Sequence, residues 1–209
     1  MAVQVADKNE KAREKEERIL DVAKKRFLHY GYRKTTVDEI AADAGIGKAS
    51  IYLLFKNKED ILLQLIDSEA RSLQRFLYGK IKDEPDPLRK LEMIFEEAMN
   101  YLEENPFLKR LLMRDPEIIS PKLVEHILDV NDRYIDIVEV YVKQVMEGRD
   151  DLAFKPRVVA YTIYKLFESF SYYSTLGEED EISTQEIGSF VSTLLHRGLA
   201  YEPCEAPRE

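Results

Sequence analysis

Residues 35–63 decide the fold, and they read TTVDEIAADAGIGKASIYLLFKNKEDILL. Thr36 precedes an apolar run with helical spacing, and Glu39 follows three residues later, which is the capping-box signature of a helix start. The run ends at Gly45-Ile46-Gly47, where glycine tolerates the left-handed backbone values that a sharp turn needs. These signals predict a short helix followed by a tight turn.

A second short helix is predicted from Lys48 to Phe55, directly after the turn. Ile51 and Phe55 lie one helical turn apart and form its inner face. Its other face carries Lys48, Ala49, Ser50, Tyr52 and Leu53. Asn57 can cap a third helix, with Lys58 in its first turn. Two helices joined by a turn of about 3–4 residues, the second bearing Lys, Ser and Tyr, form the helix-turn-helix that enters the major groove. The residues therefore predict binding to DNA.

The same stretch resembles the recognition helix and the following helix of the TetR family of one-component regulators. The resemblance rests on Lys48-x-Ser50-x-Tyr52-x-x-Phe55-Lys56-Asn57-Lys58-Glu59-Asp60, on Phe27-x-x-Tyr30-Gly31-Tyr32 and on Thr35-Thr36-Val37, and it covers roughly residues 15–65. Gly47 stands where family members often have Ser, and Leu53 and Leu54 stand where they often have His or another aromatic residue. The resemblance therefore transfers no particular base preference.

The resemblance implies a set of DNA-contacting residues: Thr36, Lys48, Ala49, Ser50, Tyr52, Leu53 and Lys58. Thr36 has an alternative role as a helix cap, and one hydroxyl at a helix N-terminus can do both. For Lys48 and Ser50 the alternative is a solvated helix surface. Lys58 at a helix start opposes the helix macrodipole, which a phosphate contact would offset.

Composition bounds the class of protein. The 209 residues suit one small domain and one larger one. No apolar run approaches the roughly 20 residues of a membrane span, and the first residues are charged where a signal peptide needs an apolar core. The single cysteine, Cys204, cannot form an internal disulfide, which fits a reducing compartment. We therefore expect a cytoplasmic protein without a membrane partner.

Charge is distributed unevenly along the chain. The formal net charge is −9, but residues 1–60 hold 13 Lys and Arg against 11 Asp and Glu. The remaining residues hold 18 Lys and Arg against 29 Asp and Glu. This asymmetry favours a phosphate-facing N-terminal end, and its small positive balance predicts moderate affinity per subunit and reliance on dimerisation.

The predicted fold class is all-α, with an N-terminal three-helix helix-turn-helix domain, a larger C-terminal ligand-binding and dimerisation bundle, and about nine helices in all. Helices are expected over about 15–30, 36–44, 48–55, 58–79, 87–104, 107–114, 121–146, 156–175 and 183–200. The expected domains are a flexible arm (1–12), the helix-turn-helix domain (13–62), the ligand-binding and dimerisation domain (63–201) and a polar tail (202–209).

The C-terminal region is rich in aromatic residues and methionine. A pocket for an effector is one interpretation, with apolar walls and hydroxyls at its rim. Its expected residues are Phe95, Met99, Met113, Tyr134, Ile137, Tyr141, Tyr164 and Phe167. The alternative is packing at helix surfaces and at a dimer interface. Acyl chains, aromatic compounds and cationic drugs all suit such a cavity, and a hydrophobic small molecule is preferred.

The last two helices are apolar over more than one face, so each must be buried on two sides. They suggest a four-helix bundle with a second copy of the chain, which is how the TetR family builds its dimer. The expected interface residues are Val159, Thr162, Leu166, Phe170, Phe190 and Leu194. A two-fold dimer would present two recognition helices to successive major grooves of a palindromic operator.

The leading hypothesis is a transcriptional repressor that a hydrophobic effector releases from its operator. The alternative is an effector-independent architectural or adaptor protein that uses the same DNA-binding motif. An enzyme is not expected, because none of the three histidines has the Glu-x-x-His spacing of di-metal bundles and no phosphate-binding glycine loop, CxxC pair or HExxH is present. No catalytic residue, cofactor or metal is therefore expected.

Overall fold

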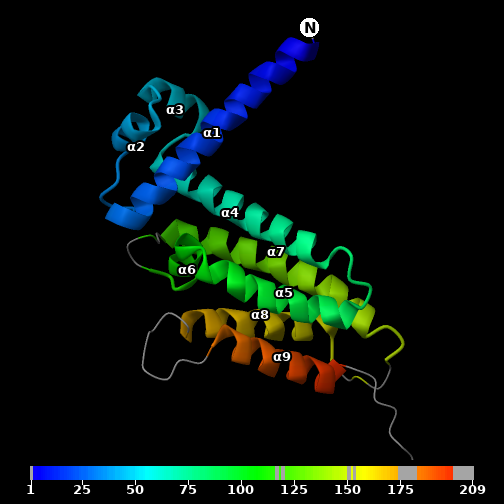
Figure 1. The fold of residues 1–209 in the computed structure, drawn as a ribbon. Coiled ribbons are helices and arrows are strands. Elements are labelled where there is room, and N and C mark those ends of the chain that lie inside the picture. The colour runs from blue at the N-terminus through cyan, green and yellow to red at the C-terminus, as the bar shows by residue number, and fades with distance from the viewer. Residues whose placement is uncertain are drawn as a thin grey trace, which may run out of the picture. The chain divides into compact units, whose positions relative to one another are not determined.

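The computed structural model describes residues 2–115, 118, 121–149, 152, 154–173 and 183–199. Within those ranges the backbone forms nine α-helices and no strand (Figure 1), which confirms the all-α prediction. The helices are α1 (Ala2–Tyr30), α2 (Val37–Ala44), α3 (Lys48–Leu54), α4 (Lys58–Ile81), α5 (Pro87–Glu103), α6 (Pro106–Leu112), α7 (Pro121–Val145), α8 (Pro156–Tyr173) and α9 (Thr184–Leu199). The predicted polar tail and the predicted helix ends at 175 and 200 lie outside the described residues.

The chain divides into two compact units. The first is Met1–Ser72 with Pro106–Leu128, and the second is Leu73–Asn105 with Asp129–Glu209. The boundaries therefore fall inside α4, between α5 and α6, and inside α7. Helix α6 belongs with the helix-turn-helix, because it packs against α1. The roles assigned to residues 13–62 and 63–201 concern function rather than packing, and they stay predictions.

Helix α1 begins at Ala2, which corrects the predicted start near Lys15. Residues 11–18 are all Ala, Arg, Glu or Lys, which are strong helix formers. A helix made of such residues does not need an apolar stripe where it is exposed, so a search for apolar periodicity misses it. The predicted flexibility of residues 1–12 stays a prediction. The other eight helices begin within one residue of their predicted starts.

Local capping signals explain several of these starts. The Thr36–Glu39 capping box is present at α2, and at α4 the Asn57 side-chain oxygen accepts a hydrogen bond from the Asp60 amide at 2.8 Å. Asp86 accepts from Leu88 N at 3.0 Å at the start of α5, directly before Pro87. Because each cap joins residues two or three apart, the sequence alone predicts it.

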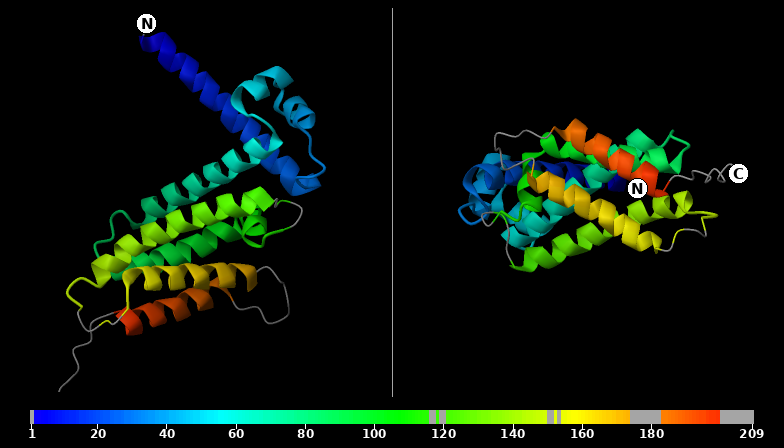
Figure 2. Two further views of the ribbon diagram at one scale, coloured as in Figure 1. Left: turned by 180° about the vertical axis from the view of Figure 1, so that it is seen from behind. Right: turned by 90° about the horizontal axis from the view of Figure 1, so that it is seen from below.

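The second unit is built around α5, which packs against both α8 and α9 (Figure 2). Leu91 is fully buried on α5, and Phe95 and Met99 are 2% exposed. Ala160 and Val191 contribute buried side chains from α8 and α9. None of the described helices is both long and apolar enough to cross a membrane.

Candidate functional site

The turn between α2 and α3 positions the candidate recognition helix. Gly45 ends α2 with φ 63°, a left-handed conformation that favours glycine, and Ile46 N donates to Ala41 O at 3.0 Å. Helix α3 then buries Ile51 completely, and Phe55 directly after it is 1% exposed. The inner face predicted for this helix is therefore confirmed.

The opposite face of α3 is open to solvent. Tyr52 is 48% exposed and Leu53 is 85% exposed, and Lys48 and Ala49 are also exposed, whereas Ser50 is half-buried. Leu53 lies outside the core, so its apolar side chain is free to contact a partner surface. The structure thus brings these five predicted DNA-contacting residues onto one short helix, and their contact with DNA stays a prediction.

Lys48 joins α3 to α2 through an ion pair. Its Nζ lies 2.5 Å from Asp38 Oδ1, and this hydrogen bond raises the pKa of Lys48. Both side chains are more than half exposed, so the pair contributes little to stability. A DNA phosphate at this place would compete with the Asp38 carboxylate for the ammonium group.

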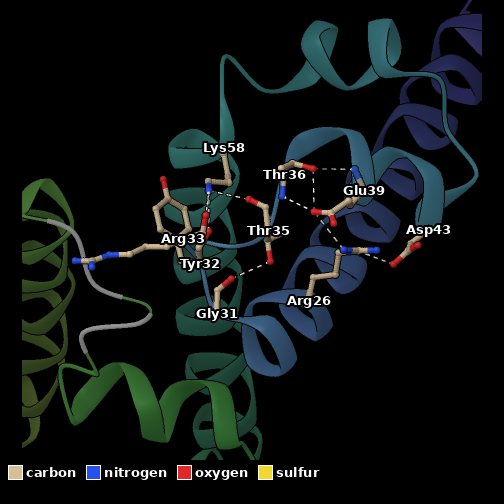
Figure 3. Close-up of polar contacts among 9 residues, drawn as sticks. All are labelled: Arg26, Gly31, Tyr32, Arg33, Thr35, Thr36, Glu39, Asp43 and Lys58. Carbon is tan, nitrogen blue, oxygen red and sulfur yellow. Dashed lines mark hydrogen bonds and ion pairs between the residues drawn. The ribbon is translucent and has the colours of Figure 1, made fainter.

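The Thr36 hydroxyl is engaged in the capping box, as Figure 3 shows. Its Oγ1 donates to Glu39 Oε2 at 2.9 Å and accepts from Glu39 N at 3.3 Å. The Thr36 amide also donates to Glu39 Oε2 at 2.8 Å, and these bonds hold the pKa of Glu39 below its usual range. Arg26 of α1 pairs with Glu39 at 3.4 Å and with Asp43 at 2.6 Å. The predicted capping role is confirmed, while a phosphate contact by Thr36 stays a prediction.

Lys58 lies at the first residue of α4, and its ammonium group faces the backbone of the α1–α2 loop (Figure 3). Nζ donates to Tyr32 O at 2.7 Å, to Thr35 O at 2.7 Å and to Arg33 O at 3.4 Å. It also lies 4.4 Å from the centroid of the Tyr32 ring, and burial lowers the pKa of Lys58. These carbonyl oxygens accept the hydrogen bonds of the ammonium group, and a phosphate contact by Lys58 stays a prediction. In the sequence, the signal for such an acceptor is the position of Lys58 at the start of a helix, where a positive charge opposes the helix macrodipole.

A hollow of about 160 Å³ lies within the second unit. Three of its residues were predicted, namely Tyr134, Ile137 and Tyr141. The other lining residues were not predicted: Gln74, Leu77, Tyr78, Ile81, Ile94 and Val138. Four of the missed residues follow the i, i+3, i+4, i+7 spacing along α4, which shows that they share one face of the helix but not what that face contacts.

The remaining predicted pocket residues are placed elsewhere. Phe95, Met99 and Tyr164 are buried in the core of the second unit, and Phe167 packs against it. The Phe95 and Phe167 rings meet edge to face at 6.3 Å between their centroids. Met113 follows α6 in the first unit. Their contact with an effector stays a prediction.

The predicted interface residues fall into two groups. Val159, Leu166 and Phe170 of α8 are partly buried against the core. Thr162 is exposed, and Phe190 and Leu194 of α9 are 54% and 44% exposed. Val158 and Tyr161 of α8 are also exposed large hydrophobic residues. Both helices therefore carry apolar side chains outside the core.

Metal coordination has no support among the described residues, because no group of three or more His, Cys, Asp or Glu side chains there could hold a metal ion. The predicted site residues that the structure brings together lie on the exposed face of α3 and around the hollow of about 160 Å³.

Comparisons with known proteins agree with this arrangement. The family model "Bacterial regulatory proteins, tetR family" matches residues 19–65. The fatty acid metabolism regulator protein of Bacillus subtilis (strain 168) is 26% identical over 138 residues, which are 63% of this chain and 71% of that protein. Several further HTH-type transcriptional regulators match this chain over less than half of their own length.

Two solved structures share the fold. The transcriptional regulator FadR from Bacillus subtilis, in complex with stearoyl-CoA, matches with a TM-score of 0.72 and 21% identity over 89% of this chain and 99% of that one. AibR, in complex with isovaleryl coenzyme A and operator DNA, matches with a TM-score of 0.63 and 16% identity over 90% of this chain and 100% of that one. At such identities the likeness shows the fold, and the matched helix-turn-helix shows the family. Residues 19–65 of this chain belong to the TetR family of bacterial regulatory proteins.

Proposed function

We propose that the chain is a sequence-specific DNA-binding transcriptional regulator, a cytoplasmic homodimeric repressor that a hydrophobic small molecule releases from a palindromic operator. The observation that carries the proposal is the two-sided character of α3. Ile51 anchors one face completely, while Tyr52 and Leu53 next to it are 48% and 85% exposed. A helix held in this way can enter a major groove without unfolding its own domain.

Dimerisation is supported by the exposed apolar side chains of α8 and α9. Val158, Tyr161, Phe190 and Leu194 are each at least 44% exposed, although both helices also bury residues in the core. A second copy that covers these side chains would complete a four-helix arrangement with two-fold symmetry. Such a dimer places two recognition helices on two half-sites.

The effector is proposed to be an acyl-coenzyme A thioester whose acyl chain enters the hollow. The hollow is lined mainly by Leu77, Ile81, Ile94, Ile137 and Val138, with Gln74 and three tyrosines as polar groups. Apolar walls with a few polar groups suit an acyl chain, and a volume of about 160 Å³ suits a short one. FadR and AibR are both described with acyl-coenzyme A ligands, which supports this class of effector. Release of DNA requires that the effector bind the DNA-incompetent conformation more tightly.

The DNA-binding proposal is tested by selection of bound sequences from a random DNA pool. Wild type is compared with Tyr52→Ala and with the matched control Tyr30→Ala, which removes a tyrosine that is 52% exposed on α1. We expect a palindromic consensus from wild type and from the control, and its loss in Tyr52→Ala. Failure of wild type to enrich any sequence at low salt without ligand would remove the proposal.

The effector proposal is tested on the selected consensus. We measure the Kd for DNA with stearoyl-CoA, isovaleryl-CoA, free coenzyme A and stearate. An increase in Kd with an acyl-coenzyme A but not with free coenzyme A supports the proposal. An equal Kd in all four would refute the effector while leaving the DNA-binding role in place.

A further inference from the structure

We infer that Lys58 is a positioning residue for DNA binding: its ammonium group ties the start of α4 to the α1–α2 loop (residues 31–36) and so sets the position of the helix-turn-helix, rather than contacting a phosphate. The inference rests on the proposed DNA-binding function. Lys58 belongs to α4, the loop leads directly into α2, and all of them lie in the first unit.

The loop carries an ordered set of carbonyl groups. Gly31 has φ 81°, a left-handed value, and turns the chain at the end of α1. Thr35 is fully buried, and its Oγ1 and its amide both donate to Gly31 O, at 2.9 and 3.3 Å. These hydrogen bonds close the loop on itself. The carbonyl oxygens of Tyr32, Arg33 and Thr35 all face the same atom, Lys58 Nζ (Figure 3).

The ammonium group of Lys58 has one N–H donor for each of these three carbonyl oxygens. A lysine ammonium has three N–H donors, and here the three carbonyl oxygens lie 2.7, 2.7 and 3.4 Å from Nζ. A phosphate could be bound only if one of these bonds were given up. The Tyr32 ring, 4.4 Å away, covers the ammonium group from another side. Hydrogen bonds from a charged donor are stronger than neutral ones, so losing one of them has a cost that a phosphate contact would have to offset. We call this set of contacts between Lys58 and the loop the clip.

The clip connects α4 to the recognition helix through short links. The carbonyl of Thr35 precedes Thr36, which is the N-cap of α2. Helix α2 then packs directly against α3 across the tight turn at Gly45. A displacement of the first turn of α4 therefore moves the loop, then α2, and then α3. This path gives α4 a physical means to place the recognition helix.

Three variants separate positioning from phosphate contact. Lys58→Met keeps much of the side-chain length and removes charge and donors, whereas Lys58→Gln removes the charge and keeps two N–H donors. Lys56→Gln is the matched control, because Lys56 is an exposed lysine two residues away. Hydrogen exchange of the Thr35 amide is measured in the free protein, with α5 amides as the check that the chain is folded.

In the free protein we expect Lys58→Met to exchange at Thr35 at least about tenfold faster than wild type, with Lys58→Gln in between and Lys56→Gln unchanged. This measurement needs no DNA, so it tests whether Lys58 holds the loop even if the proposed DNA-binding function is wrong. An unchanged Thr35 exchange rate in Lys58→Met would overturn the inference.

On DNA, the Kd for the selected consensus is measured between about 50 and 200 mM salt. Positioning predicts weaker binding by Lys58→Met, partial recovery in Lys58→Gln, and the wild-type slope of log K against log salt in both. A phosphate contact instead predicts equal losses in both variants and a slope smaller by about 0.9 per lysine removed. That second pattern would also overturn the inference.

Discussion

Replacement of Ile51 by alanine tests whether the recognition helix is held by its inner face. Ile51 is fully buried, and it is the buried residue of a helix of 7 residues. A helix this short is not stable by itself in water, because isolated helices below about 12–15 residues are marginal. Its conformation therefore depends on this side chain and on Phe55 after it.

The expected loss of stability can be worked out from the burial. Ile51→Ala removes three carbon groups from the core, and at about 0.8 kcal/mol for each buried methylene the transfer cost is about 2.4 kcal/mol. The cavity left behind raises the total to about 3–4 kcal/mol, within the range of such substitutions. Since domains are stable by only about 5–15 kcal/mol, this is a large part of the whole.

Urea unfolding measures this loss. With a slope of about 1–3 kcal/mol per molar urea, the midpoint should fall by more than about 1 M. Exchange of the Ile40 amide in α2 reports the first unit separately. Ile51→Val should cost about 0.5–1.5 kcal/mol, and Tyr52→Ala, on the opposite face, less than about 0.5 kcal/mol. A cost below about 1 kcal/mol for Ile51→Ala together with a larger one for Tyr52→Ala would refute this orientation of α3.

Three further changes address other parts of the molecule. Gly47 caps α3 with φ −61° and no side-chain hydrogen bond, and a Cβ there would meet nothing within 4 Å. Gly47→Ser should therefore raise the free energy of unfolding by about 0.5–1 kcal/mol in urea titrations, and a decrease would argue against the cap. Burial raises the pKa of Tyr134, so the folded state keeps a proton that the unfolded chain loses above about pH 10. Stability should be intact below that pH and decline above it, and Tyr134→Phe should reduce the decline seen in urea midpoints between about pH 9 and 11; parallel declines would contradict this. The double variant Phe190→Glu with Leu194→Glu should shift the mass in analytical ultracentrifugation from dimer to monomer, because it charges the exposed apolar side chains of α9, and an unchanged mass would place the interface elsewhere.

The helix starts were predictable because their causes are local. Thr36 with Glu39, and Asp86 with Leu88, are two or three residues apart, so a helix cap can be recognised in the sequence without knowing the fold. The inner face of α3 was predictable for the same reason, since Ile51 and Phe55 lie one turn apart. The start of α1 was missed because high helix propensity, rather than an apolar stripe, forms its exposed part.

The partners of charged and aromatic side chains were not predictable, because they come from distant parts of the chain. Lys58 meets carbonyls 23–26 residues away, whereas its place in the family motif suggested a phosphate. The hollow was only partly predicted, since its α4 wall depends on which face of α4 turns toward α5 and α7.

The sequence by itself determined the all-α class, the helix-turn-helix, most helix starts and the family, because each follows from spacings of a few residues. Only the tertiary structure decided that α6 packs with α1, that Phe95 and Met99 belong to the core, and that Lys58 holds a loop. Those outcomes depend on which side chains meet after the helices pack. Local spacing does not encode such contacts between distant segments.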